Sequence, residues 1–387
     1  MRTITAVTVA RSDLGIYLPV WKRIVAEPGL RLEVIAAGAH LVDEFGRTER
    51  DIAAAGFEIV DRVETLLAAD SPAAVSRSIG LGVLGFAQAF ARRRPDILLA
   101  LGDRHEMLAA VAAALPQTIP VAHLHGGETS EGAIDESIRH AITKLSHLHF
   151  VAAEDYRRRV VQLGEEPWRV TVSGAPGLDH LRALPPLSQE ELERRIGMPL
   201  SPPPLLVTFH PATLEHERTA DQTAELLAAL AASDLPVVFT YPGADAGARI
   251  IIAAVEEFAK DRPRARCVNS LGSQAYFSLL RLAAAMVGNS SSGIIEAASF
   301  ELPVVNVGNR QRGRLRAANV VDAPCRREEI YRAIRTATGA PFRESLRGLQ
   351  NPYGDGRAAE RIVAVLRDAP LDERLIVKRF HDLPSVV

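Results

Sequence analysis

Short apolar runs alternate with longer amphipathic segments along the first half of the chain. The apolar runs match buried parallel strands, and the segments between them follow the helical period. Strand and helix alternate in this way seven times, which predicts a doubly wound, mostly parallel α/β sheet. The predicted strands are Ile4–Ala10, Leu32–Ala37, Phe57–Val60, Ile97–Leu101, Ile119–Leu124, His149–Ala152 and Val170–Ser173.

The alternation stops in a proline-rich stretch and starts again at Leu205. The second series of predicted strands is Leu205–Phe209, Val237–Tyr241, Arg266–Val268, Ala285–Gly288, Pro303–Val307 and Asn319–Val321. We therefore expect two Rossmann-like domains, residues 1–184 and 205–356, joined by a linker over residues 185–204. Residues 357–387 are expected to form a last helix and a tail that pack back on the first domain.

Composition agrees with two globular domains and narrows the possible partners. The chain has 387 residues, 47% of them hydrophobic, and a net charge of −2. This balance gives no basic surface for nucleic acid or an anionic membrane, and no unbroken apolar run reaches the ~18 residues of a membrane span. Two cysteines without metal-type spacing fit a reducing cytoplasm, and the first residues predict a strand rather than a signal peptide.

Acidic and imidazole side chains follow two neighbouring predicted strands in the first domain. Asp103 comes after one strand, Glu128 after the next, and Asp135 opens the following helix. Carboxyl groups brought together at the carboxyl edge of a sheet can acquire separated pKa values and exchange protons with a bound substrate. We predict these three as catalytic. Three neighbours are predicted to contact the substrate: Arg104, His125 and Glu136.

The same side chains also fit purely structural or metal-binding roles. Asp103 could simply pair with Arg104 or Arg139, and Asp135 could cap a helix. His123 and His125 with Glu128 could instead hold zinc or manganese, although no fixed ligand set emerges from their spacing. We predict no metal.

A second cluster lies at the predicted start of a helix in the second domain. Ser290, Ser291 and Gly293 belong to a run of three serines between an asparagine and a glycine. Backbone N–H groups and hydroxyls at such a helix start can bind phosphate, although a single serine there often only caps the helix. Glu296 could accept two ribose hydroxyls, or else stabilise the helix dipole from its first turn.

Three further residues stand near predicted strand ends. Arg310 could bind a diphosphate, as guanidinium groups do, while the arginines around it could be a solvated basic loop. His210 could donate to a phosphate or a leaving oxygen, or be structural. Arg11 follows the first strand, where a surface ion pair is the alternative.

Seven motifs in this order resemble the hydrolysing UDP-N-acetylglucosamine 2-epimerases of the sialic-acid type. The resemblance covers essentially the whole chain. The motifs are LGDRHE, HLHGGE, IDESIRHAITKLSH, FHPATL, GNSSSGIIE, NVGNRQRGR and NPYGDG.

The resemblance implies a B-type glycosyltransferase fold whose two domains face each other across a cleft, with no metal or nicotinamide cofactor. It implies elimination of UDP with loss of the C2 proton, followed by hydration of the 2-acetamidoglucal to N-acetylmannosamine. By the same resemblance Asp103, Glu128 and Asp135 match the catalytic acids, and His210 assists departure of the diphosphate. The positions that match diphosphate and ribose contacts are Arg11, Ser290, Ser291, Arg310 and Glu296.

UDP-N-acetylglucosamine is the substrate this resemblance favours. UDP-2,4-diacetamido-2,4,6-trideoxyglucose, the substrate for legionaminic acid, and GDP-sugars are the alternatives, since the motifs do not separate them. A retaining glycosyltransferase and a non-catalytic nucleotide-sugar sensor are the rival classes. A homodimer is expected from the resemblance alone. The central prediction is spatial: the acids of the first domain and the serine-rich turn of the second close over one sugar nucleotide.

Overall fold

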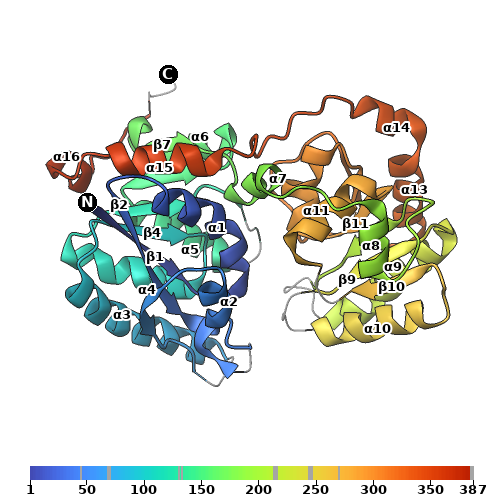
Figure 1. Ribbon diagram of the computed structural model, residues 1–387, viewed down its shortest axis with the longest axis horizontal. Helices are drawn as coiled ribbons and strands as arrows, with labels where there is room; N and C mark the ends of the chain where they lie inside the picture. Colours follow the sequence, from blue (N-terminus) through green and yellow to red (C-terminus); the bar gives the residue numbers. More distant parts are fainter. Residues whose placement is uncertain are drawn as a thin grey trace. The chain divides into compact units, whose positions relative to one another are not determined.

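A computed structural model of the chain describes residues 1–43, 46–67, 71–129, 131, 134–211, 217–242, 247–268 and 271–383. The side chain of residue 72 is not described. The chain divides into two compact units, and each carries its own parallel sheet (Figure 1). Unit 1 comprises Met1–Glu128, Ile134–Asp179 and Tyr353–Val387, and unit 2 comprises Thr129–Ala133 and His180–Pro352.

The sheet of unit 1 has the order β3-β2-β1-β4-β5-β6-β7, with all pairs parallel. The order reverses between β1 and β4, so right-handed crossovers place helices on both faces and the reversal leaves a crevice at the carboxyl edge. Its strands are β1 (Arg2–Thr8), β2 (Leu30–Ala37), β3 (Ile59–Val63), β4 (Ile97–Leu101), β5 (Val121–Leu124), β6 (Leu148–Val151) and β7 (Val170–Val172).

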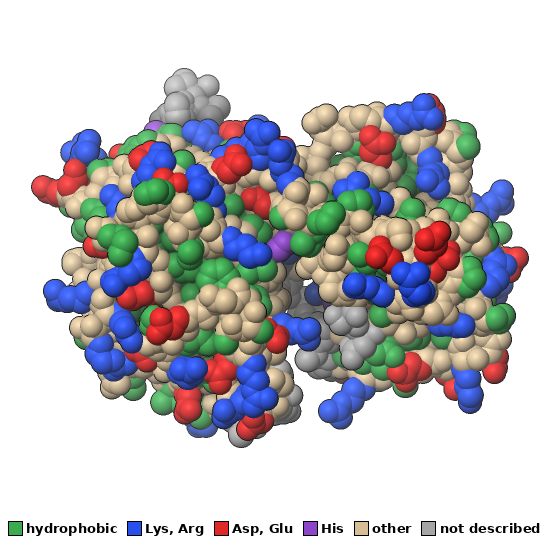
Figure 2. Space-filling view, in the orientation of Figure 1, with side chains coloured by type: hydrophobic (Ala, Val, Ile, Leu, Met, Phe, Trp, Pro, Cys, Tyr) green, Lys and Arg blue, Asp and Glu red, His purple; other side chains and the backbone are tan. Residues whose placement is uncertain are grey.

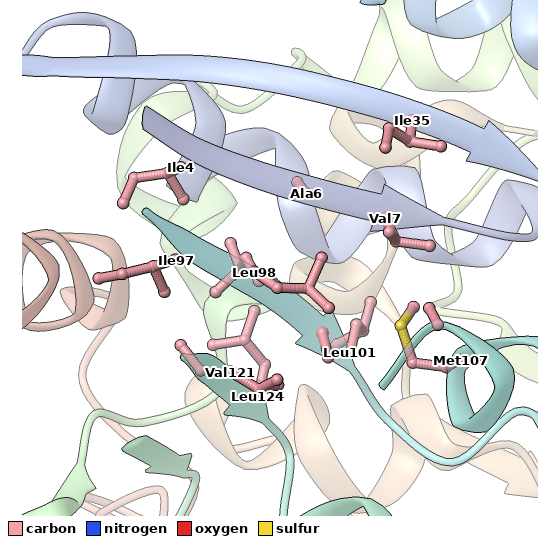
Figure 3. Packing of buried hydrophobic residues seen from close by; sticks show 14 of the residues in the cluster. Ile4, Ala6, Val7, Ile35, Ile97, Leu98, Leu101, Met107, Val121 and Leu124 are labelled. Carbon is pink, nitrogen blue, oxygen red and sulfur yellow. The ribbon is translucent and has the colours of Figure 1, made fainter. Parts of the chain in front are cut away.

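Helices on the two faces of this sheet complete unit 1. They are α1 (Arg11–Val25), α2 (Glu49–Ala54), α3 (Pro72–Arg93), α4 (His105–Ala114), α5 (Ile134–Leu145), α6 (Glu154–Gln162), α15 (Ala358–Asp368) and α16 (Glu373–Ile376). In the core, Ile4, Ile97 and Val121 from neighbouring strands pack together (Figure 3). The helical spacing of apolar residues from Leu41 to Ala55 predicts one helix there, but in the structure α2 begins only at Glu49. Residues 44–45 lie outside the described residues.

Helix α3 corrects the expectation that no apolar run reaches the length of a membrane span. The stretch Ala73–Arg93 is long and apolar enough to cross a membrane by length and composition alone, although 33% of its most apolar window is buried. The helix packs along α4 and against β3, and its Phe86 and Phe90 are fully buried. It is therefore one of the helices that cover the sheet of unit 1.

Unit 2 repeats this plan with the parallel order β10-β9-β8-β11-β12-β13, which reverses between β8 and β11. Its strands are β8 (Leu205–Thr208), β9 (Val237–Thr240), β10 (Ala265–Val268), β11 (Ala285–Gly288), β12 (Val304–Val307) and β13 (Val320–Ala323). Its helices are α7 (His180–Ala183), α8 (Gln189–Ile196), α9 (Thr219–Ser233), α10 (Ala248–Lys260), α11 (Gly272–Leu282), α12 (Ser291–Ile295), α13 (Arg327–Thr338) and α14 (Ala340–Ser345).

The segment expected to be a linker, residues 185–204, is part of unit 2 instead. Its helix α8 starts with a capping box between Ser188 and Glu191, as the sequence predicts. One turn apart on α8, Leu192 and Ile196 are buried in a core cluster that also contains Leu206 of β8. This apolar face outweighs the proline content of the segment, and the boundary lies after Asp179 rather than after residue 184.

Near the C-terminus, helix α15 packs against α1 in unit 1, beside which it lies in Figure 1. The carboxylate of Asp179 accepts hydrogen bonds from the backbone N–H groups of Ala358 (2.9 Å) and Ala359 (2.7 Å) and thereby caps α15. On the visible face of both units, acidic and basic side chains are interspersed (Figure 2), as expected from the near-neutral net charge.

Candidate functional site

The carboxyl edge of β4 and β5 in unit 1 carries the predicted catalytic acids. After β4 the chain turns at Gly102 (φ +72°), passes Asp103, and enters α4 at its N-cap residue Arg104. After β5 it turns at His125 (φ +62°) and reaches Glu128, which is buried. Because β4 and β5 are neighbours, these two loops leave the sheet side by side.

One buried arginine joins the two loops. The Arg139 guanidinium of α5 donates to the Asp103 carboxylate and, at 2.9 Å, to the backbone carbonyl of His125. The ion pair weighed as the structural alternative for Asp103 is therefore present. It holds Asp103 in place, and 23% of the Asp103 side chain stays exposed at the edge.

Glu128 is held by its own loop. His125 Nδ1 lies 2.6 Å from Glu128 Oε1. The loop needs glycine at Gly127 (φ +74°), because a Cβ there would lie 2.6 Å from the backbone oxygen of Tyr156. His125 therefore contacts the predicted catalytic acid directly, while its predicted contact with substrate stays a prediction.

His123 is a fully buried residue whose proton can be assigned from its partners. Its Nε2 lies 2.8 Å from the carbonyl of Gly102, so Nε2 carries the hydrogen, and its Nδ1 accepts from the Thr143 hydroxyl at 3.2 Å. Burial lowers the pKa of His123 to about 3, which keeps the ring neutral. Both nitrogens are therefore engaged in fixing the turn before Asp103.

These contacts leave little support for the metal alternative. Among the described residues, no group of three or more His, Cys, Asp or Glu side chains is arranged to hold a metal ion. His123 and His125 do not form a pair of ligands, because His125 turns away from the strand in a left-handed conformation.

Asp135 sits in the first turn of α5, where it faces the same edge. Burial, and after it the charge of Asp103, raises the pKa of Asp135, while Arg104 and Arg139 oppose this shift. Its neighbour Glu136 contacts His140 Nε2 at 3.1 Å. The edge thus holds carboxyl groups in different environments, which is the requirement for distinct acid and base roles.

Arg11 is the first residue of α1 and follows the end of β1. Its side chain is 70% exposed and lies 3.8 Å from Asp51, so the expected surface ion pair is present and weak. The loop before it is fixed by Asp13, whose carboxylate accepts from the N–H groups of Val9 and Ala10.

In unit 2, His210 and the serine-rich turn lie where the strand order reverses, after β8 and β11. The Asn289 side chain joins them: its Oδ1 accepts from the N–H of His210 (2.7 Å), and its Nδ2 donates to the carbonyl of His210 (2.8 Å). Gly288 (φ +133°) allows this approach, because a Cβ there would lie 2.0 Å from the carbonyl oxygen of Thr208.

The three serines have different local partners. Ser290 is the N-cap of α12, and its hydroxyl accepts from the N–H of Ser292 (3.3 Å). Ser292 in turn accepts from the Tyr276 hydroxyl at 2.7 Å. Gly293 has a packing role: a Cβ there would lie 3.0 Å from Val304 Cγ1, so the glycine brings α12 close to β12. Ser291 opens the helix.

Glu296 lies just beyond the C-terminal end of α12, which has only five residues. The alternative that it stabilises a first helical turn is therefore wrong, because the helix is shorter than expected. Burial raises the pKa of Glu296, and a hydrogen bond from Ser292 opposes the shift. A hydrogen bond from Tyr276 to Ser292 and a second one from Ser292 to Glu296 thus hold this carboxyl group in place.

Arg310 and Gln311 both turn toward the same strand end. Arg310 donates to the carbonyl of Asn289 at 3.2 Å, and Gln311 donates to the same oxygen at 2.9 Å. This places the guanidinium of Arg310 beside the serine-rich turn. Within unit 2, the structure therefore brings His210, Ser290 and Arg310 together around one asparagine.

The comparisons with known proteins decide the family. A family model described as UDP-N-acetylglucosamine 2-epimerase matches residues 22–367. The chain belongs to the UDP-N-acetylglucosamine 2-epimerase family. The match favours this family over the retaining glycosyltransferase considered from the sequence.

Two relatives match this epimerase over nearly their whole length. A UDP-N,N'-diacetylbacillosamine 2-epimerase (hydrolyzing) from Legionella pneumophila is 37% identical over 98% of this chain and 99% of its own. A GDP/UDP-N,N'-diacetylbacillosamine 2-epimerase (hydrolyzing) from Campylobacter jejuni is 36% identical over 99% of each chain.

A crystal structure of the UDP-GlcNAc 2-epimerase from Neisseria meningitidis bound to UDP-GlcNAc shares the fold of this epimerase. Its TM-score is 0.81 at 18% identity, over 95% of this chain and 99% of that chain. Both doubly wound units thus belong to the glycosyltransferase B-type fold that the sequence predicts.

Several residues that hold the candidate site residues in place are missing from the sequence prediction of the site. Arg139, Asn289, Gln311 and Tyr276 hold the predicted residues in place. Only Arg139 gave a usable signal, because it lies four residues after Asp135 on one helical face. The other three act through partners that are distant in sequence or through backbone atoms, which no local pattern reveals.

Proposed function

We propose that this protein is a hydrolysing 2-epimerase of UDP-linked 2-acetamido sugars. The observation that supports it best is the cluster of acids at the edge of unit 1, where Asp103 lies close enough to raise the pKa of Asp135. A glycosyl transfer that leaves C2 unchanged has no use for this cluster, whereas an epimerisation at C2 needs a base and an acid there.

The proposed reaction has two balanced halves. A base removes the C2 proton while the C1–oxygen bond to UDP breaks, which gives UDP and a 2-acetamidoglucal with a C1–C2 double bond. Water then adds its hydroxyl to C1, and a proton returns to C2 on the opposite face. The sum is sugar nucleotide plus water to UDP plus the free 2-epimer.

The structure supports proton transfer at the sugar by residues of unit 1 and binding of the nucleotide by residues of unit 2. Asp135, whose pKa is raised, suits the group that returns the proton to C2, and Asp103 or Glu128 suits the base. Ser290, Ser291, Arg310 and His210 suit the diphosphate, with His210 assisting its departure, and Glu296 suits the ribose. Arg11, Arg104, Glu136 and Gly293 are further proposed contacts. Closure of the two units over one sugar nucleotide is part of this proposal.

Among UDP sugars, we propose UDP-N,N'-diacetylbacillosamine, a 2,4-diacetamido-2,4,6-trideoxyglucose, as the preferred substrate. The 37% and 36% identical relatives carry this activity in their names and match nearly the whole chain. UDP-N-acetylglucosamine, favoured from the sequence motifs, is the second candidate, because the family model bears that name. We further propose that the enzyme works in the cytoplasm, as a homodimer, on the path to a legionaminic-type acid.

Incubating the enzyme with each of these UDP sugars and a GDP analogue in D2O, without any acceptor, tests the reaction. Release of UDP together with a free 2-epimer that carries deuterium at C2 is the expected result. A product with unchanged C2 configuration and no deuterium, or release of UDP only when an acceptor sugar is added, would contradict the proposal. Comparison of initial rates then ranks the substrates.

Asp103→Asn and Glu128→Gln should each lower turnover by about 10²–10⁴-fold, the usual contribution of a general acid or base. UDP binding, which is assigned to unit 2, serves as the control and should change little in calorimetry. Near-normal turnover in both variants would show that these carboxyl groups are not the catalytic ones.

A further inference from the structure

A cavity of about 480 Å³ opens at the carboxyl ends of β12 and β13 in unit 2. This volume lies in the range of small-molecule sites in proteins. Four arginines line it: Arg218, Arg312, Arg316 and Arg326. We call it the arginine cavity.

The charge of the arginine cavity is strongly positive. Asp322 is the one acidic residue among its described lining residues, and its carboxylate already accepts from Arg316 (2.9 Å) and Asn306 (2.7 Å). Arg316 also donates to the carbonyl of Gln311 at 3.2 Å, so its guanidinium is held in place. Arg312 pairs with Glu131 at 3.4 Å, but its side chain is 76% exposed, and such surface pairs are weak.

Two helix N-termini add to this charge. Arg218 is the N-cap residue of α9 and Arg326 that of α13; at α13 the first backbone N–H, that of Arg327, already donates to the carboxylate of Glu225. The N-terminal end of a helix carries partial positive charge and N–H donors. Asp221, Glu328 and Glu329 lie in the first turns of these helices but not in the lining of the cavity.

The arginine cavity is distinct from the predicted diphosphate site. Arg310 donates to the carbonyl of Asn289 and is not among the lining residues of the cavity. The lining contains Gly308, Asn309 and Arg312 but not Ser290, Ser291 or Glu296. The loop after β12 thus contributes Arg310 and Gln311 to the strand end beside Asn289, and Gly308, Asn309 and Arg312 to the arginine cavity.

We propose that the arginine cavity is a second anion site, which binds a phosphate-bearing ligand of the diphosphate class. Guanidinium groups bind phosphate oxygens in pairs, and four of them with two helix N-termini exceed what a single phosphate monoester requires. The site does not depend on the proposed reaction. A free diphosphate and the diphosphate of a nucleotide share this chemistry.

Cys325 lines the cavity and supplies the readout. Its thiol donates to the carbonyl of Gln222 (3.4 Å), and the only other cysteine, Cys267, is not part of the lining. The full-length protein is labelled with neutral iodoacetamide at constant ionic strength, and each cysteine is followed by mass spectrometry. Inorganic pyrophosphate should slow labelling of Cys325 in a saturable way and leave Cys267 unchanged.

Arginine variants test whether pyrophosphate protects Cys325 by binding in the arginine cavity. Arg218→Gln with Arg326→Gln should raise the half-protecting concentration about tenfold or more, as loss of charged hydrogen bonds predicts. Arg332→Gln, an exposed arginine on α13 that pairs with Glu329, is the matched control and should behave as the parent. Arg310→Gln should keep the protection.

Comparing UDP with inorganic pyrophosphate shows whether the arginine cavity binds a nucleotide or a free diphosphate. UDP protecting at lower concentration than pyrophosphate assigns a nucleotide to the cavity, and equal protection assigns the diphosphate alone; uridine should not protect in either case. Absence of protection by both, or protection that survives the double variant and disappears in Arg310→Gln, would overturn the proposal.

Discussion

Arg139 shows how one buried side chain can organise a site without being part of its chemistry. Its guanidinium binds a carboxylate from the loop after β4 and a backbone carbonyl from the loop after β5. Burying a cation is costly unless it is paired and hydrogen-bonded, and here both requirements are met. The position of Asp103 is therefore fixed by a residue 36 positions later in the chain.

Asp135 lowers stability through its burial and, after that, through its place beside Asp103. Because its folded-state pKa is raised, it destabilises the fold above its unfolded pKa, and this cost disappears as the pH falls to the unfolded value. We expect Asp135→Asn to raise the melting temperature at pH 7 by about 1–3 °C. Scanning calorimetry should show the difference vanish near pH 4.

The same variant should lose turnover, because an amide cannot return a proton to carbon. A gain in stability together with a loss of turnover marks a residue kept for function rather than for folding. Lower stability of Asp135→Asn at pH 7 would instead mean that the ionised carboxylate is favourable in its environment. Ser137→Ala, an exposed change on the same helix, is a suitable control.

At the scale of elements, the sequence predicts the strands well and the short helices poorly. Apolar runs locate β4, β5, β8 and β11, and therefore the edges where candidate residues gather, because buried parallel strands leave a continuous apolar signal. The end of α12 after Ile295 was not predictable, since the continuing apolar residues gave no stop signal. In the structure the chain continues after Glu296 as a 3-10 turn over Ala297–Phe300.

The contact between α11 and α12 predicts that Tyr276 affects ribose binding through Glu296. Tyr276 of α11 donates to Ser292, which in turn hydrogen-bonds Glu296. Removing the hydroxyl in Tyr276→Phe frees Ser292 and loosens Glu296. We expect the KM for the UDP sugar to rise about 5- to 20-fold with kcat nearly unchanged, as loss of one hydrogen bond predicts.

A substrate analogue makes this test specific. With a 2'-deoxyuridine diphosphate sugar, parent and Tyr276→Phe should differ less, because one of the two ribose hydroxyls that Glu296 is proposed to bind is gone. Tyr241→Phe is the control, since the Tyr241 hydroxyl bonds Glu256 at the surface. An equal KM change with both substrates would assign Tyr276 a purely structural role.

At the scale of the molecule, the described histidines whose pKa is lowered by burial lie in unit 1. Burial lowers the pKa of His123 to about 3 and of His147 to about 4, and it lowers that of His149. Their unfolded value is 6.5, so they contribute stability that is present above pH 6.5 and lost as the pH falls toward their folded values. Each contributes about 1.4 kcal/mol per pH unit in that window.

Unit 1 should therefore unfold before unit 2 on acidification. The chain provides separate reporters, because both tryptophans, Trp21 and Trp168, lie in unit 1 and both cysteines, Cys267 and Cys325, lie in unit 2. We expect tryptophan fluorescence to change between about pH 6.5 and 4 while the reactivity of the thiols toward 4,4'-dithiodipyridine shows no increase from unfolding of unit 2. Simultaneous exposure of both, or earlier exposure of the thiols, would contradict this order.

The path of the chain has a consequence for synthesis. Unit 1 is left at Asp179 and resumed at Tyr353, and the returning segment supplies Ile362, Val363 and Leu366 to its core. A growing polypeptide thus carries nearly all of unit 2 before the helix that covers α1 has been translated. The part of the protein that the ribosome makes first is the part that is completed last.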